Sequence, residues 1–319
     1  MAEESTASTG NGAGAKPVFD TKAGFVALIG APNAGKSTLL NQLVGSKVSI
    51  VTHKVQTTRA LIRGVAMVGK SQVIFVDTPG IFRPKRRLDR AMVTTAWGGA
   101  HDADLVSILV DAKRGLDDPT REILTKLDDV RQPKILILNK IDLVPRDSLL
   151  ALSMEANALA RFDATFMVSA LTGSGVQDVT DWFASRMPTG PWLYPEDQIS
   201  DLPMRSLAAE ITREKLFLRL HDELPYESTV ETEVWKQIGR GKAKKVRIEQ
   251  TIYVSRDSQK RIVLGHQGST IKAISMAARE EIAEMVEEPV DLFLFVKVRE
   301  NWADDPERYR EMGLEFPTR

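Results

Sequence analysis

The 319-residue chain contains no cysteine, and aromatic residues make up only 6% of it. Without cysteine there are no disulfide bonds, thiolate metal ligands or cysteine nucleophiles. No apolar run approaches the roughly 20 residues that a membrane-spanning helix needs, and no apolar stretch follows a basic start at the N-terminus. These absences predict a cytoplasmic protein.

The chain also lacks an excess of either charge, because 43 basic residues balance 43 acidic ones. Any binding of nucleic acid must therefore depend on local basic patches rather than on overall charge. The length is typical of about two domains.

Local composition divides the chain further. Residues 1–21, rich in Ala, Gly, Ser and Thr in their first part, predict a disordered tail. A proline-dense stretch, Met187–Pro195, predicts an interdomain linker over 190–203 whose aromatic residues dock on one domain. The domains expected on either side cover 22–189 and 204–299, and residues 300–319 form a C-terminal extension.

A phosphate-binding motif stands near the start of the chain. Its residues fit the pattern G-x-x-x-x-G-K-[ST] at every fixed position, between an apolar run of strand type (24–29) and a predicted helix (38–44): Gly30, Ala31, Pro32, Asn33, Ala34, Gly35, Lys36 and Ser37. Backbone N–H groups of such a loop surround the phosphates, Lys36 reaches the β- and γ-phosphates, and the Ser37 hydroxyl ligates Mg²⁺. The strand-loop-helix context argues against a chance match.

A second motif predicts which base is bound. The apolar strand 134–138 ends in Asn139, Lys140 and Asp142, at the strand end where open α/β sheets bind ligands. Asp142 can accept from guanine N1–H and from the exocyclic amine, whereas adenine offers no such donor pair, so the nucleotide is predicted to be GTP. Lys140 would lie along the base, and Ser169-Ala170 would offer a backbone N–H to the guanine oxygen.

Between these motifs lie candidates for sensing the γ-phosphate. Strand 73–76 leads into Asp77, Thr78, Pro79 and Gly80, which would place a carboxylate near Mg²⁺ and a glycine N–H near the γ-phosphate. A strand-end Asp before Pro-Gly is often only a turn residue, but the preceding P-loop favours the metal role. Thr57 and Thr58 are candidates for the threonine that closes over Mg²⁺, and we favour Thr58 slightly. The predicted metal ligands are therefore Ser37, Thr58 and Asp77.

The usual water-positioning glutamine is missing. Its place after Asp-x-x-Gly is taken by Ile81, so unassisted hydrolysis should be slow. The residues expected to support catalysis are Lys36, Asn33, Thr58 and Gly80. Four arginines in or near the switches either face phosphate or point to solvent or RNA: Arg59, Arg83, Arg86 and Arg87.

The second half of the chain has its own signature for binding a nucleic-acid backbone. A helical segment (259–264) leads into Gly265, His266, Gln267 and Gly268, and Ser269-Thr270 are expected to cap the helix that follows. A strand at 290–298 closes the order helix (about 205–221), strand (229–237), strand (246–255), helix, G-x-x-G, helix, strand. Such a loop can hold about four single-stranded nucleotides. Lys272 and the basic stretch 235–247, with Lys242, Lys244 and Lys245, are further candidates for RNA contacts.

Together these motifs resemble the Era-type branch of translation-factor-related GTPases. The resemblance implies an α/β P-loop GTPase domain, with a mostly parallel sheet flanked by helices, followed by an α+β type II KH domain. It also implies a Mg-dependent GTPase that switches between GTP and GDP, binds single-stranded 16S ribosomal RNA near its 3′ end and assists assembly of the small (30S) ribosomal subunit. A monomer is expected, with peripheral contact at the inner face of the cell membrane.

The resemblance also bears on Asn33. Related GTPases with Pro-Asn at this place use the Asn to hold K⁺, so K⁺ is a second candidate cofactor, although Asn33 could equally hydrogen-bond the loop to itself. The chain departs from the family at His266 and Gln267, because Era-type loops commonly carry Lys there. A GTP hydrolase of metabolism or tRNA modification, and a membrane-remodelling GTPase, are the alternatives; the G-x-x-G loop with its basic hairpin favours RNA.

Overall fold

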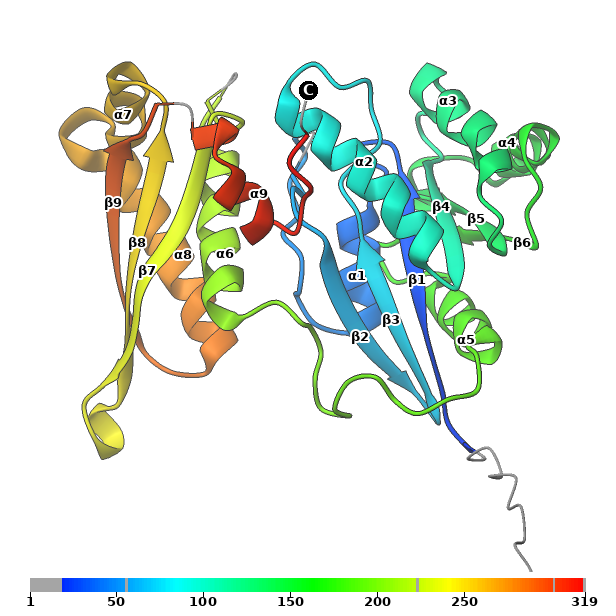
Figure 1. Cartoon of the computed structure of the whole chain (residues 1–319), viewed down its shortest axis with the longest axis horizontal. Helices are drawn as coiled ribbons and strands as arrows, with labels where there is room; N and C mark the ends of the chain where they lie inside the picture. Colours follow the sequence, from blue (N-terminus) through cyan, green and yellow to red (C-terminus); the bar gives the residue numbers. More distant parts are fainter. Residues whose placement is uncertain (1–18, 55–56, 222–223, 301, 318–319) are drawn as a thin grey trace, which may run out of the picture.

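The computed structural model describes residues 19–54, 57–221, 224–300 and 302–317. Two domains lie side by side, joined by an extended linker at one end and by the C-terminal segment between them (Figure 1). Of the predicted tail, residues 1–18 lie outside the described part of the chain. The first strand, β1, begins at Lys22, directly after the predicted tail.

The N-terminal domain is built on a six-stranded sheet in the order β2-β3-β1-β4-β5-β6. Only β2 is antiparallel to its neighbour. The strands are β1 Lys22–Gly30, β2 Ile62–Val68, β3 Ser71–Asp77, β4 Leu105–Asp111, β5 Lys134–Asn139 and β6 Ala164–Val168. β3 and β4 are buried along their whole length, as expected for strands covered on both faces.

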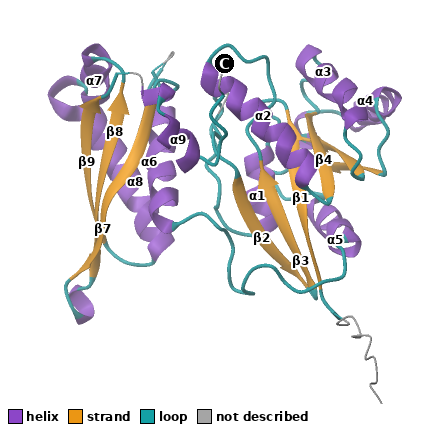
Figure 2. Cartoon of the chain, in the orientation of Figure 1, coloured by secondary structure: helices purple, strands orange, loops and turns teal. Residues whose placement is uncertain are grey.

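Helices cover both faces of this sheet (Figure 2). They are α1 Lys36–Val44, α2 Arg87–Asp102, α3 Asp118–Lys126, α4 Arg146–Leu159 and α5 Val176–Arg186. α1 and α5 share one hydrophobic core with the sheet, and α2, α3 and α4 share a second core on the other face. The carboxyl ends of β1, β3 and β5 therefore open at one edge, where the phosphate and base motifs meet.

The C-terminal domain has the predicted α-β-β-α-α-β order. It comprises α6 Met204–Arg219, β7 Ser228–Ile238, β8 Lys245–Val254, α7 Asp257–Leu264, α8 Ser269–Val286 and β9 Val290–Val298. β8 pairs antiparallel with β7 and parallel with β9. This arrangement confirms the type II KH topology, and the elements begin and end within a few residues of the predicted positions.

One local prediction about this domain is wrong. Ser269 and Thr270 do not cap α8: the N-cap is Gly268, in the left-handed region (φ 77°), and no side-chain hydrogen bond caps the helix. A Cβ atom on Gly265 would come 2.2 Å from Thr270 Oγ1, so Thr270 packs closely against the loop.

The linker follows the edge of the N-terminal sheet. Trp192 Nε1 donates to the Lys70 carbonyl (3.2 Å), and the Gln72 side chain accepts from the N–H groups of Leu193 (2.8 Å) and Tyr194 (2.9 Å). Ser200 then bridges to Gly64 on the edge strand β2. The linker aromatics thus dock on the N-terminal domain.

The C-terminal extension packs between the domains. α9 (Pro306–Glu311) brings fully buried Tyr309 and nearby Leu314 against Leu88, Ala91 and Met92 of α2. Trp302, also buried, donates to the Glu227 carbonyl (3.0 Å).

Candidate GTPase and RNA-binding sites

A hydrogen bond connects the P-loop to the base-recognition motif. Asn139 Nδ2 donates to the Ala34 carbonyl (2.8 Å). Gly35 (φ 96°) lies so close that a Cβ atom there would come 2.2 Å from Asn139 Nδ2. Only glycine fits both the backbone conformation and this approach.

Lys36 lies at the mouth of the P-loop and is buried. Its Nζ donates to the carbonyls of Gly30 (3.2 Å) and Ala31 (3.1 Å). Burial lowers the pKa of Lys36 to about 8, against the opposing effect of the Asp77 charge. A desolvated ammonium in this position is suited to bind phosphate.

Four oxygen-bearing side chains meet beside the P-loop. Asp77 Oδ2 accepts from Ser37 Oγ (2.6 Å), Ser49 Oγ (2.9 Å) and Thr58 Oγ1 (3.3 Å), and the Ser37 and Thr58 hydroxyls are 2.8 Å apart. Burial raises the pKa of Asp77, while the Lys36 charge and these hydrogen bonds oppose that rise.

This cluster fits a hard divalent cation. Asp77 Oδ1 is buried and has no hydrogen-bond partner among the described residues. An unpartnered carboxylate oxygen beside two hydroxyls is the kind of donor set that Mg²⁺ prefers. Ser37, Thr58 and Asp77, the predicted metal ligands, therefore come together.

The two candidate threonines point to different places. The Thr57 hydroxyl bonds to the Thr52 hydroxyl (2.6 Å) and the Lys54 carbonyl (2.9 Å), within its own segment, whereas Thr58 reaches Ser37 and Asp77. This geometry supports Thr58 as the metal-facing residue.

A narrow cavity of about 60 Å³ lies between the P-loop and the switch residues, with Gly80 on its wall. A Cβ on Gly80 would come 2.9 Å from Pro32 Cα, so only glycine lets the two segments approach this closely. Thr78 is buried, and its hydroxyl donates to the Leu28 carbonyl (2.8 Å). Ile81 is 5% exposed and packs in the core, so it cannot position water.

The base motif differs in part from the prediction. Lys140 Nζ donates to the Asn33 carbonyl (2.7 Å) and pairs with Asp111 (2.7 Å), and Asp142 is exposed just beyond β5. A backbone N–H of the Ser169-Ala170 pair was expected to face guanine, but both N–H groups donate within the protein, Ser169 to the Ser174 carbonyl and Ala170 to Asn139 Oδ1, each at 2.9 Å. Sequence reasoning also missed Asp111, whose only sequence signal is its place at the end of β4.

Asn33 makes a contact that neither sequence hypothesis included. Its Nδ2 donates to the His53 carbonyl (2.9 Å), so it joins the P-loop to the first switch, that is, to the segment between α1 and β2 that includes residues 51–54 and 57–58, rather than to itself. Its left-handed backbone (φ 64°) directs the side chain across the cleft.

The switch arginines do not face the phosphate cleft. Arg59 is 5% exposed and donates to the carbonyls of Ser228 (2.8 Å), Tyr226 (3.0 Å) and Pro225 (3.1 Å) in the KH domain. Burial lowers its pKa to about 9, and the Arg213 charge adds to this. The other three form ion pairs: Arg83 with Glu122, Arg86 with Glu227 and Arg87 with Asp304. The expectation that Arg59 faces phosphate, solvent or RNA is wrong, because it is an interdomain contact.

The G-x-x-G loop has the tight backbone expected of it. Gly265 (φ 71°), Gln267 (φ 50°) and Gly268 (φ 77°) all have positive φ. The side chains of His266 and Gln267 are exposed, and Lys272 is exposed on the first turn of α8.

The basic hairpin lies at the other end of the domain. It joins β7 to β8, whereas the G-x-x-G loop comes after α7, which begins at the other end of β8 (Figure 1). The ten residues of β8 alone span roughly 30 Å. Lys244 pairs with Glu288 and Lys245 with Asp291, while the side chain of Lys242 lies outside the described part of the structure. The predicted RNA residues therefore do not form one continuous surface.

This set of features, a P-loop, a metal-facing triad and an Asn-Lys-x-Asp motif on a mostly parallel sheet, followed by a KH fold, defines a P-loop GTPase with an RNA-binding module. Family models agree: one described as a 50S ribosome-binding GTPase matches residues 25–140, and a KH domain model matches residues 223–303. GTPase Era of Mesorhizobium japonicum is 69% identical over 93% of this chain and 95% of its own length. GTPase Era of Rhizobium meliloti is 67% identical over 96% of each chain.

Solved structures show the same likeness. A point variant of Aquifex aeolicus Era bound to GDP.AlF4⁻ has a TM-score of 0.85 and 37% identity, covering 92% of this chain and 99% of that one. Era in complex with MgGDPNP and nucleotides 1506–1542 of 16S ribosomal RNA has a TM-score of 0.86 with the same identity and coverage. The chain belongs to the Era family of GTPases, and it hydrolyses GTP. Among the described residues, no helix is long and apolar enough to cross a membrane.

Proposed function

We propose that this chain is a GTP-dependent switch that binds single-stranded RNA at the 3′ end of 16S ribosomal RNA and assists assembly of the small ribosomal subunit. The observation that carries the proposal is the full-length likeness to the Era structure that holds MgGDPNP and nucleotides 1506–1542 of 16S ribosomal RNA. A factor of this kind acts in the cytoplasm. Peripheral contact with the membrane is a prediction that follows from the family resemblance.

Residues from five segments of the chain are proposed to hold the nucleotide. The proposed GTP contacts are the P-loop residues 30–37, Thr57, Thr58, the segment Asp77–Gly80, Asn139, Lys140, Asp142 and the Ser169-Ala170 pair. Asp142 reads guanine because its carboxylate accepts from two base donors. Since the Ser169 and Ala170 amides are already donated within the protein, any contact from them to guanine requires a local exchange of hydrogen bonds.

Ser37, Thr58 and Asp77 are the proposed Mg²⁺ site. When bound, Mg²⁺ neutralises charge on the β- and γ-phosphates. Lys36 supplies a further positive charge, and Gly80 allows its segment to approach the P-loop. With Ile81 buried, the chain has no side chain at that position to orient water, so unassisted hydrolysis is slow.

Asn33 is the proposed site of an effect of K⁺. Its Nδ2 donates to the His53 carbonyl, which places the Asn33 amide group beside a backbone oxygen of the facing segment. GTP turnover measured in K⁺ and in Na⁺ at equal ionic strength tests this; equal rates reject it.

RNA is proposed to bind at the end of the KH domain that carries Gly265, His266, Gln267, Gly268 and Lys272. Without a lysine in the loop, phosphate binding there depends mainly on backbone N–H groups. The hairpin lysines Lys242, Lys244 and Lys245 would then contact a different part of a long RNA.

The decisive experiment is binding of a labelled 16S 3′-end RNA to protein loaded with GDP or with a non-hydrolysable GTP analogue, over a salt series. Sequence-dependent binding that is stronger in the GTP-like state supports the proposal. Binding that depends only on salt and ignores both sequence and nucleotide rejects it, since that is the behaviour of a non-specific basic surface.

A further inference from the structure

Helix α6 packs on the core of the KH domain with one side and contacts the N-terminal domain with another. Apolar residues such as Ile211 and Leu216 pack inside that domain, while Arg213 and Glu214 are 2% and 3% exposed and reach the N-terminal domain. These two charged side chains are buried because the first switch lies on them.

Arg213 holds the switch immediately before Thr58. Its Nη2 donates to the Thr57 carbonyl (2.6 Å), and the same guanidinium pairs with Glu210 one turn earlier. The guanidinium also lies over the Phe217 ring, 5.1 Å from its centroid. Its position is therefore fixed by its own helix before it meets the switch.

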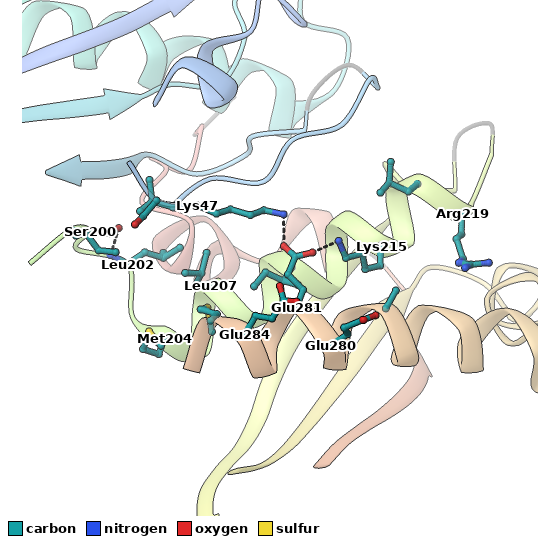
Figure 3. A pocket seen from close by; sticks show the side chains of 17 residues that line it. Lys47, Ser200, Leu202, Met204, Leu207, Lys215, Arg219, Glu280, Glu281 and Glu284 are labelled. Carbon is teal, nitrogen blue, oxygen red and sulfur yellow. Dashed lines mark hydrogen bonds and ion pairs between the residues drawn. The ribbon is translucent and has the colours of Figure 1, made fainter. Parts of the chain in front are cut away.

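Glu214 holds the beginning of the same segment. Its Oε1 accepts from the Val51 N–H (2.8 Å), and its Oε2 accepts from Lys47 (2.7 Å) and Lys215 (2.9 Å). Figure 3 shows Lys47 and Lys215 both turned toward Glu281 of α8, in the cavity of about 1210 Å³ between the domains. Neighbouring residues of α6 thus bind the switch at two points, Val51 and Thr57.

Packing alone does not explain this arrangement. Arg213 Nη1 is buried without a hydrogen-bond partner among the described residues, and a buried charge is a costly way to fill space that an apolar side chain of similar volume could fill. The directed bond to the Thr57 carbonyl is what the arginine adds. Thr58 follows directly, and its hydroxyl lies 2.8 Å from Ser37 Oγ.

We propose that Arg213 and Glu214 are positioning residues of the GTPase site: the KH helix α6 holds the first switch so that Thr58 faces the metal site. The inference rests on the proposed role of Thr58 as a Mg²⁺ ligand. The coupling between α6 and the nucleotide site is reciprocal. If the contacts of α6 with the first switch raise the affinity for GTP relative to GDP, then bound GTP strengthens those contacts by the same factor. Displacing α6 from the switch thereby weakens GTP binding more than GDP binding.

The test compares three variants in the full-length chain. Arg213→Met keeps an unbranched side chain of similar helix propensity, although a shorter one, and removes its donors. Arg213→Lys keeps one charged donor. Arg205→Met is the matched control, since Arg205 is on the same helix but donates to the Thr232 and Glu233 carbonyls of its own domain. The readouts are the affinities for a fluorescent GTP analogue and for fluorescent GDP, and the Mg²⁺ concentration that half-saturates turnover.

The expected result for Arg213→Met is a ratio of GTP to GDP affinity at least about fivefold lower than wild type, with a higher Mg²⁺ requirement. Arg213→Lys recovers part of the ratio and Arg205→Met leaves it unchanged. An unchanged ratio in Arg213→Met, or an equal loss for both nucleotides, overturns the proposal, because a merely structural role weakens both alike.

Thr58→Ala separates this inference from the proposed function. If Thr58→Ala lowers the ratio but Arg213→Met does not, the positioning role is wrong and the metal role stands. If Thr58→Ala itself leaves the ratio unchanged, the proposed metal role fails. In the double variant that combines Thr58→Ala with Arg213→Met, a loss no greater than that of Thr58→Ala alone is expected, since the Arg213 contact acts through the position of Thr58.

Discussion

At the scale of single residues, the chemistry of the site depends on groups whose environment differs sharply from water. Lys36 is the clearest example, because burial lowers its pKa to about 8 while its task requires the charged form. Bound phosphates favour that charged form. The affinity for nucleotide should therefore depend on pH in the range where the free side chain loses its proton.

The direction of this dependence follows from the proton balance. Below about pH 8 Lys36 is already charged and GTP binding takes up no proton there; above it, binding requires a proton and weakens as pH rises. We expect the GTP affinity to fall by up to about tenfold per pH unit above about pH 8, measured by fluorescence titration from about pH 7 to about pH 9.5. Lys36→Arg should give a flatter profile, because arginine stays charged over this range. Parallel profiles for the two proteins would contradict the assignment.

Asp142 gives a second residue-scale prediction. Replacing its carboxylate with an amide presents a donor where guanine also presents one, so Asp142→Asn should lose GTP affinity by roughly 10²-fold or more and gain affinity for xanthosine triphosphate. Competition titrations with the two nucleotides measure the change. A loss of GTP binding with no gain for the xanthine nucleotide would mean that Asp142 supports the loop and does not contact the base.

At the scale of elements, the motifs with strict local spacing could be predicted, and the contacts between distant elements could not. The P-loop, Asp77 and Asn139 follow directly from strand ends, so their place in the sheet is set by the sequence around them. Arg59 and Arg213 carry no comparable local signal, since their partners lie more than 150 residues away. Arg213 and Glu214 lie among other charged residues of α6, such as Glu210 and Lys215, so the sequence alone does not mark them out.

The basic hairpin and the G-x-x-G loop lie at opposite ends of β8, which the spacing of the motifs along the sequence does not show. This separation leads to a prediction with two matched variants. Gly268→Asp introduces a Cβ at φ 77° and a negative charge at the loop, so RNA affinity should fall at least about tenfold while GTP hydrolysis is unchanged. Lys244→Ala, at the opposite end and already paired with Glu288, should change affinity for a short RNA less than about threefold. Equal losses in the two variants, measured by fluorescence anisotropy, would contradict the assignment of the loop.

At the scale of the whole molecule, the two domains are held by polar contacts at the first switch and by an apolar contact at the C-terminal extension. The apolar contact places Tyr309 on α2, which begins just beyond the second switch at Asp77–Gly80. The Tyr309 ring meets Phe316 edge to face, with centroids 4.8 Å apart. Arg87, at the first turn of α2, lies over Phe316 and pairs with Asp304 of the same extension.

Tyr309 is therefore expected to stabilise the interface as well as the fold. Tyr309→Ala should lower the free energy of unfolding by about 3 kcal/mol, as for other large buried side chains, and make the domains unfold at separate temperatures in calorimetry. Tyr309→Phe keeps the ring and should cost less than about 1.5 kcal/mol. Because α2 follows the second switch, we also expect Tyr309→Ala to reduce the difference in RNA affinity between the GTP-like and GDP states. A Tyr309→Ala protein that unfolds in one transition and keeps the full nucleotide dependence of RNA binding would show that the extension only covers α2, and that the contacts of α6 carry the coupling alone.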